Sequence, residues 1–221
     1  AEFEGHMLEV TLGPGMLSRN YDGLQNDLDK MEGVFLRRGE YTFPLDNDKL
    51  WDFKPLAKVG DKVTAGGWLG EVDENFQPHK IMVPFTFKGE YTVKSLKEAG
   101  QYTIGEVIAV LTDETGKDVE VTMIQRWPVK RAITCYKEKP RPYKLLETGV
   151  RTIDTVNPIV EGGTGFIPGP FGTGKTVLQH AISKQAEADI VIIAACGERA
   201  NEVVEIFTEF PELIDRIRAV S

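Results

Sequence analysis

A glycine-rich run at residues 169–176, GPFGTGKT, has the residue types and spacing needed to hold phosphate groups. It satisfies G-x-x-x-x-G-K-[S/T] in full, a pattern whose glycines allow the backbone to aim successive N–H groups inward. We expect Lys175 to reach the β and γ phosphates of a nucleotide, and the Thr176 hydroxyl to bind the Mg²⁺ that bridges them. The candidate phosphate-binding residues are these eight and the next: Gly169, Pro170, Phe171, Gly172, Thr173, Gly174, Lys175, Thr176 and Val177.

Two other interpretations of this run exist. One is a glycine-rich turn with a solvated lysine, which the eight matching positions and their context argue against. The other is a dinucleotide fold, whose turn requires G-x-G-x-x-G. After Gly172 and Gly174 the sequence continues Lys-Thr-Val, so the third glycine is missing.

Elements that alternate between strand and helix are expected to position the loop. The pattern predicts a strand at 165–167, a helix over 176–188, a strand over 189–196 and a helix over 201–210. Such alternation indicates an α/β domain with a parallel sheet and crossover helices. Because the carboxyl ends of parallel strands face the ligand, Glu198 and Arg199 are expected to point toward the phosphate loop.

Glu198 is the candidate catalytic carboxylate, because a carboxylate there can polarise the water that attacks the γ phosphorus. The competing interpretation is a solvated loop carboxylate paired with Arg199. The residues alone leave both open.

A second, β-rich region precedes the loop. Between 34 and 111, turn signals such as Gly60-Asp61 and Gly66-Gly67 separate short apolar runs, which predicts a small all-β module. It resembles a lipoyl- or biotinyl-carrier barrel, but Pro78 stands where a carrier would have its modified lysine. Lys80 is too near the following Val-Pro pair to replace it, so we expect the barrel shape without the attachment chemistry.

Composition narrows the function classes. The chain has 221 residues, with 26 Lys and Arg against 34 Asp and Glu, a net charge of −8 that disfavours nucleic-acid binding. The longest apolar run, 190–196, is far shorter than the roughly 18 residues of a spanning helix, so no direct membrane insertion is expected. Two cysteines fit a reducing compartment, which predicts a cytoplasmic location. Three dispersed histidines lack metal-ligand spacing.

Taken together, the motifs resemble those of the catalytic A subunit of rotary V-type and archaeal-type (A/V-type) ATPases and ATP synthases. Thr173 stands where serine is more usual in that family. The matching segments are spread along nearly the whole chain: 12–17, 21–23, 80–84, 149–154, 169–176 and 196–202. The stretch 214–221 does not match.

The resemblance implies ATP or ADP with Mg²⁺ as ligands, Lys175 and Thr176 as phosphate and magnesium ligands, and Glu198 as the residue that positions the hydrolytic water. Arg199 matches a neighbour near the phosphates. It also implies three regions: the end of an N-terminal β-barrel with a lead-in (1–33), a lipoyl-like bulge insertion (34–122) and part of the nucleotide-binding domain (123–221).

The partners implied by the resemblance are non-catalytic B subunits in an alternating hexameric ring, a central stalk, and a peripheral stalk reached through the bulge. The implied location is the cytoplasmic face of a membrane, in the soluble sector that couples ATP hydrolysis or synthesis to proton or sodium transport. Two alternatives stay open: a related hexameric ATPase, and a fragment that acts only as a scaffold without turnover. The fragment interpretation predicts exposed apolar faces and an unpaired sheet edge after about residue 150.

Overall fold

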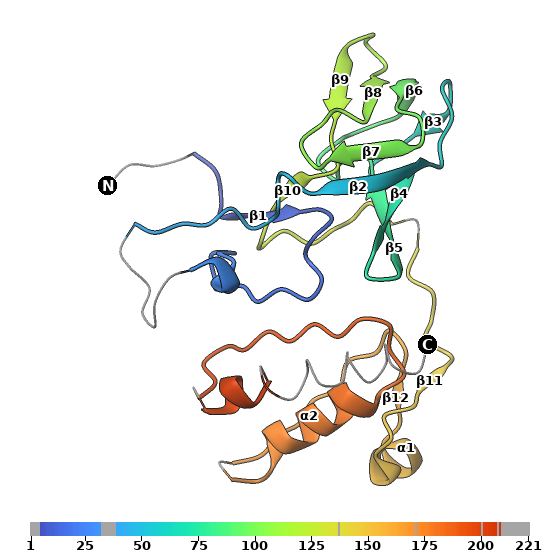
Figure 1. The fold of residues 1–221 in the computed structure, drawn as a ribbon. Helices are drawn as coiled ribbons and strands as arrows, with labels where there is room; N and C mark the ends of the chain where they lie inside the picture. Colours follow the sequence, from blue (N-terminus) through green and yellow to red (C-terminus); the bar gives the residue numbers. More distant parts are fainter. Residues whose placement is uncertain are drawn as a thin grey trace. The chain divides into compact units, whose positions relative to one another are not determined.

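The chain divides near residue 138 into two units, which are described separately. In this computed structural model the described residues are 5–31, 39–136, 138–170, 172–199, 201–206 and 208. Unit 1 is Ala1–Glu138 and unit 2 is Lys139–Ser221. Figure 1 shows the strands of unit 1 in blue to yellow-green and the helices of unit 2 in yellow to red.

Unit 1 consists of antiparallel strands in three sheets. A ribbon pairs β1 (Glu9–Leu12) with β10 (Gln125–Pro128), so the two ends of the module lie side by side. The first four-stranded sheet has the order β5 (Gln77–Met82), β4 (Trp68–Glu74), β2 (Leu50–Pro55), β7 (Gly100–Thr103). The second has the order β3 (Lys62–Val63), β6 (Tyr91–Leu96), β8 (Ala109–Thr112), β9 (Asp118–Val121).

Alternating side chains bury one face of each sheet. In β2, Trp51 and Phe53 are buried while the residues beside them are exposed. Only glycine fits at position 70 of β4, because a Cβ atom there would lie 2.2 Å from the ring of Phe53. The core forms two clusters: Leu45, Trp51, Phe53, Val72, Ile81, Ile104, Ile108 and Met123 in one, and Leu69, Val83, Val93, Ala109, Leu111 and Val121 in the other.

The expected β-rich module is therefore present, but its strands do not close into a barrel. Within the described residues the two four-stranded sheets remain separate ladders, with register shifts in β4 near Trp68 and in β6 near Val93. Bulges of this kind bend a strand and interrupt pairing, which favours two sheets packed face to face.

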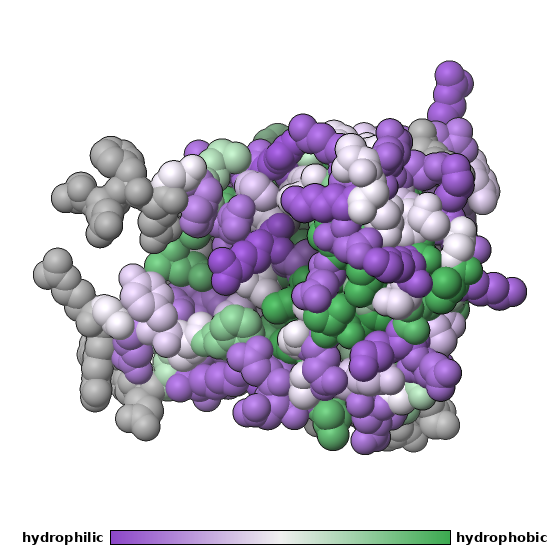
Figure 2. Space-filling view, turned by 90° about the horizontal axis from the view of Figure 1, so that it is seen from above, coloured by the Kyte–Doolittle hydropathy of each residue, from purple (hydrophilic) through white to green (hydrophobic). Residues whose placement is uncertain are grey.

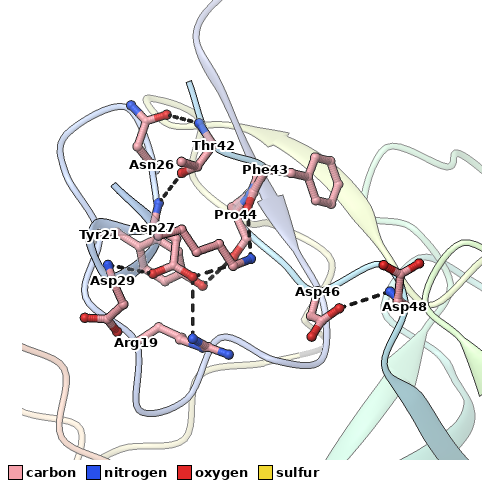
Figure 3. Close-up of polar contacts among 11 residues, drawn as sticks. Arg19, Tyr21, Asn26, Asp27, Asp29, Thr42, Phe43, Pro44, Asp46 and Asp48 are labelled. Atoms are coloured by element: carbon pink, nitrogen blue, oxygen red, sulfur yellow. Dashed lines mark hydrogen bonds and ion pairs between the residues drawn. The ribbon is translucent and has the colours of Figure 1, made fainter. Parts of the chain in front are cut away.

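A buried aspartate ties the residues before the module to those that enter it. The Asp27 side chain is fully buried; Oδ1 accepts the Asp29 N–H, and Arg19 and Lys30 each lie 3.6 Å from Oδ2 (Figure 3). The backbone N–H of Asp27 donates to Thr42 Oγ1 at 2.7 Å. This network holds the turn around η1 (Leu28–Lys30) against the segment that leads into β2.

Polar side chains cover much of the face drawn in Figure 2, with an apolar area near its middle. Several large apolar side chains of unit 1 are exposed rather than buried, among them Val59, Trp68 and Phe76.

No helix among the described residues is long and apolar enough to cross a membrane.

Unit 2 has short elements around one longer helix. A two-residue ladder joins β11 (Leu145–Leu146) to β12 (Ile159–Val160), with α1 (Arg151–Val156) between them. Helix α2 runs from Lys175 to Gln185, and residues 201–206 are helical. Helix α2 ends at Gln185, before the predicted 188, because Ala186 is extended and the Glu187 N–H donates to the Glu147 carbonyl.

The two strands predicted beside the phosphate loop are wrong for this structure. Residues 165–167 and 189–196 are described, and neither range is a strand; every described ladder is antiparallel. A parallel strand needs neighbours from distant parts of the chain, and the described residues provide none for 189–196. Ile192 is accordingly 88% exposed. The predicted helix at 201–210 is seen over 201–206, and 209–221 lie outside the described residues.

Candidate nucleotide-binding site

The phosphate loop turns into α2 through two glycines with left-handed backbone. Gly172 has φ of 80° and Gly174, the N-cap of α2, has φ of 79°. A Cβ atom at either position would meet nothing within 4 Å, so conformation rather than packing requires glycine there. The first N–H groups of α2 have no acceptor inside the helix, and its dipole adds positive potential at that end. This geometry is suited to anion binding.

Side chains of the loop close it upon itself. The Thr173 hydroxyl donates to the Pro170 carbonyl at 2.8 Å, and a Cβ at Gly169 would lie 2.5 Å from Thr173 Oγ1. The Lys175 ammonium donates to the carbonyls of Gly169 and Pro170. The lysine thus lies over the loop backbone, where it is close to any phosphate that the loop binds.

A small cavity beside the start of α2 brings Thr176 and Glu198 together. Its walls come from α2, from the segment 193–198 and from the helix at 201–206. The lining residues are Thr176, Gln179, His180, Ser183, Ile193, Ala194, Ala195, Glu198, Glu202 and Ile206. Although 189–196 is not a strand, the chain still carries Glu198 back to the loop.

Glu202 is a site residue that the sequence reasoning missed. The Thr176 hydroxyl donates to Glu202 Oε2 at 3.3 Å, across 26 residues of sequence. The sequence contained a signal for this residue, because Glu202 lies in the first turn of the predicted helix that follows Glu198. Hydroxyl and carboxylate oxygens are the ligands that Mg²⁺ prefers, so these side chains fit a magnesium site.

The other candidate site residues are Val177, Arg199 and Phe171. Val177 lies in the first turn of α2 and is 73% exposed. Arg199 is not among the described residues that line the cavity. Phe171 lies outside the described residues. Within the described part of the chain, no group of three or more His, Cys, Asp or Glu side chains could hold a metal ion.

The carrier-like module of unit 1 has no lysine at its hairpin tip. The tip between β4 and β5 is Asn75-Phe76, and Pro78 lies two residues further on in β5. Lys80 is inside β5, opposite Glu71, and forms an ion pair with it. Pro78 therefore occupies the place where a carrier would have its modified lysine, and the exposed tip itself is Asn75-Phe76.

Family models match both parts of the chain. Residues 42–130 match the ATP synthase alpha/beta subunit barrel-sandwich domain, and residues 149–220 match the nucleotide-binding domain of the ATP synthase alpha/beta family. The expectation that 214–221 falls outside the resemblance is therefore wrong for 214–220. The two matches fall on the antiparallel module and on the phosphate loop with its cavity. The chain belongs to the ATP synthase alpha/beta family.

Curated relatives give a finer likeness, to V-type ATP synthase alpha chains. The chain is 54% identical to that of Treponema denticola, over 97% of this chain and 37% of the relative. It is 52% identical to that of Borrelia garinii subsp. bavariensis and 50% identical to alpha chain 1 of Treponema pallidum, again over 97% of this chain. The chain spans a little over a third of the length of these relatives.

Proposed function

We propose that this chain provides the phosphate-binding part of the catalytic subunit of a rotary V-type ATPase or ATP synthase. In that machine, MgATP hydrolysis or synthesis is coupled to proton or sodium transport. The observation that carries the proposal is the cavity at the start of α2, where Thr176 of the phosphate loop and Glu198 line one space. A solvated loop carboxylate, the competing interpretation of Glu198, would not need that position.

Each site residue has a distinct role in the proposal. Lys175 leaves the loop carbonyls and binds the β and γ phosphates, where its charge offsets the charge that develops during transfer. Glu198 accepts a hydrogen bond from the attacking water and orients it in line with the γ phosphorus. Arg199, the next residue, adds positive charge near the phosphates.

The backbone N–H groups of the loop and of the first turn of α2, including Val177, hold the phosphate oxygens. Thr176 would ligate Mg²⁺, with Glu202 as an acceptor that orients its hydroxyl. The ion supplies charge neutralisation between the β and γ phosphates when it is bound.

The proposed setting is an alternating ring with non-catalytic B subunits, a central stalk, and a peripheral stalk reached from the β module. The names of the relatives support this setting, because each is the alpha chain of a V-type ATP synthase. The ring also matters chemically, since an arginine from a neighbouring subunit would complete the charge around the γ phosphate. The proposed location is the cytoplasmic surface of a membrane.

For the chain by itself we propose nucleotide binding without turnover. The segment that precedes Glu198 is not fixed in a sheet, with Ile190, Val191 and Ile192 between 45% and 88% exposed. A carboxylate carried on such a segment is poorly held for in-line attack, because catalytic geometry tolerates little displacement.

Calorimetry with MgATP and MgADP tests the proposal, with phosphate release measured on the same samples. Lys175→Ala should lower the affinity for MgATP about 10- to 100-fold, because a charge-assisted hydrogen bond to phosphate is lost. Lys184→Ala, in the last turn of the same helix, is the matched control and should leave the affinity within about twofold. Equal affinities for the two variants would contradict the proposed phosphate site.

A further inference from the structure

The tip of the β4–β5 hairpin of unit 1 presents an aromatic ring, that of Phe76, to solvent. Figure 1 shows this hairpin extending beyond the other strands of its sheet. Its ladder continues to the last pair, Glu74↔Gln77, leaving only Asn75 and Phe76 as the loop. Phe76 is 82% exposed at this tip. A phenylalanine that is so exposed gains little for the fold from its apolar surface.

The backbone at the tip is unfavourable for phenylalanine. Asn75 and Phe76 have φ of 53° and 66°, as a two-residue hairpin loop requires. Asparagine tolerates this left-handed region, and the second position normally has glycine. A bulky side chain there is strained, and strain of this kind is characteristic of functional sites.

The base of the tip is firmly anchored. The buried Glu74 carboxylate accepts the N–H groups of Gly15 at 2.8 Å and Leu17 at 2.9 Å through Oε1. Its Oε2 lies 2.7 Å from Nδ1 of His79. Next to it, Asn75 Nδ2 donates to Ser18 Oγ at 3.2 Å. The ring of Phe76 is therefore presented from a preorganised base, so little conformational entropy remains to be lost on binding.

From these observations we propose that Phe76 is a docking residue, which inserts into an apolar pocket on a different subunit of the assembly. A strained, solvent-exposed aromatic ring on an anchored hairpin has the geometry of a binding hot spot. The inference rests on the proposed function only for the premise that the chain works within an assembly of different subunits.

The shape and charge of the hairpin tip indicate what kind of surface Phe76 would bind. The tip is convex, so its complement is a concave protein pocket rather than a small ligand. The exposed Asp73 carboxylate accepts the backbone N–H of Phe76 at 3.1 Å, so a negative charge lies at the tip, in a chain of net charge −8. Basic side chains at the rim of the pocket would complement this acidic tip, whereas an anionic lipid surface or a nucleic acid would be repelled.

Thermal unfolding of the 221-residue chain provides the first test. Phe76→Asn should raise the melting temperature by about 2–4 °C, because it relieves the left-handed strain. Tyr41→Asn is the control: it removes an aromatic ring that is 75% exposed at a residue without positive φ, and should leave the melting temperature unchanged. An unchanged or lower melting temperature for Phe76→Asn would contradict the strain argument.

Photocrosslinking in the full-length protein within its native assembly provides the second test. Benzoylphenylalanine replaces Phe76, and replaces Tyr41 in a control sample. We expect position 76 to crosslink to an apolar residue of another subunit that has Lys or Arg nearby, at a yield several-fold above position 41. Crosslinks confined to the same chain, to a second copy of it, or to lipid would overturn the proposal.

Separate readouts distinguish the two hypotheses. An assembly that purifies intact, with no crosslink from position 76, overturns the docking proposal and leaves the proposed function standing. A protein that purifies alone contradicts both. Phe76→Asn should bind MgATP with the affinity of the unmodified chain, because the tip is not part of the phosphate site.

Discussion

Unit 1 and unit 2 differ in how their apolar residues are used. Every buried hydrophobic side chain among the described residues lies between Leu45 and Trp127, in unit 1. In unit 2, the described buried residues are Thr148 and His180, both polar. Unit 2 instead exposes large apolar side chains, with Phe166 at 86% and Ile192 at 88%. Unit 2 does not lack apolar residues, because its segment 190–196 is the longest apolar run of the chain. Composition therefore does not explain why the two units differ in burial.

The difference lies in where the strands find partners. In unit 1, pairs such as β4–β5 and β8–β9 are joined by short turns, so each strand meets an antiparallel neighbour close in sequence. A parallel strand needs a crossover of a dozen residues or more and buries both faces. The apolar segment 189–196 has that character, and the described residues contain no neighbour for it.

The largest effect expected from this comparison is on unit 1. Phe53→Ala should lower its free energy of unfolding by about 3–5 kcal/mol, because a fully buried ring is removed from the core. Ile192→Ala in unit 2 should change stability by less than about 0.5 kcal/mol, because that side chain is exposed. Urea unfolding followed by tryptophan fluorescence reports unit 1, which contains all three tryptophans; helix circular dichroism reports α2.

A large loss of helix signal in Ile192→Ala at low urea would contradict the comparison. It would mean that 189–196 is packed in solution, as in a completed sheet. A loss below about 1 kcal/mol in Phe53→Ala would instead show that the core of unit 1 relaxes around the missing ring.

The contrast also explains how far the sequence could predict the structure. Residues 169–176 and the start of α2 were predictable, because glycine positions and helix initiation are local properties of the chain. The antiparallel module was predictable for the same reason, from turn residues between short apolar runs. The strands at 165–167 and 189–196 were not, since their formation depends on partners far along the chain.

The candidate site, like the fold, could be predicted from the sequence only in part. The proximity of Thr176 and Glu198 was predicted from the rule that ligands bind at the carboxyl ends of strands, and both residues line the cavity. The contact of Thr176 with Glu202 was not, because it depends on how the helix at 201–206 packs against α2. Side-chain contacts between elements are tertiary properties, and one sequence does not encode their register in a readable pattern.

A second, smaller effect concerns a buried carboxylate that stabilises unit 1. Burial disfavours the charged form of Glu74, but hydrogen bonds from His79, Leu17 and Gly15 outweigh it and lower the pKa of Glu74 below its ordinary 4.5. A lowered folded pKa means that this stabilisation is complete above pH 4.5 and is lost as the pH falls through the folded value.

Glu74→Gln should therefore reduce the stability of unit 1 by about 1–3 kcal/mol at pH 7, since charge-assisted hydrogen bonds are lost. The difference from the unmodified chain should shrink as the pH falls below about 4.5. Urea midpoints between pH 3 and pH 7 measure it. Asp113→Asn, at a partly exposed hairpin carboxylate, is the control and should give a smaller effect. A difference that stays constant over this pH range would show that Glu74 acts by shape rather than by charge.

The smallest effect tests whether the two units unfold independently. Gly149, before α1, has φ of 72°, and a Cβ there would lie 2.6 Å from Oε1 and 2.9 Å from Cβ of Gln185, the last residue of α2. Gly149→Ala should lower the stability of unit 2 by about 1–2 kcal/mol, from left-handed strain and displacement of Gln185. Gly162→Ala, at φ of 75° with nothing within 4 Å, has the strain alone and should cost about 1 kcal/mol. The unfolding midpoint followed by helix circular dichroism should shift to lower urea concentration in both variants, while the midpoint followed by tryptophan fluorescence stays unchanged. Because the tryptophans are all in unit 1, a matching shift of their transition would mean that both units unfold as one, and the weakly packed unit would then be stabilised by its neighbour.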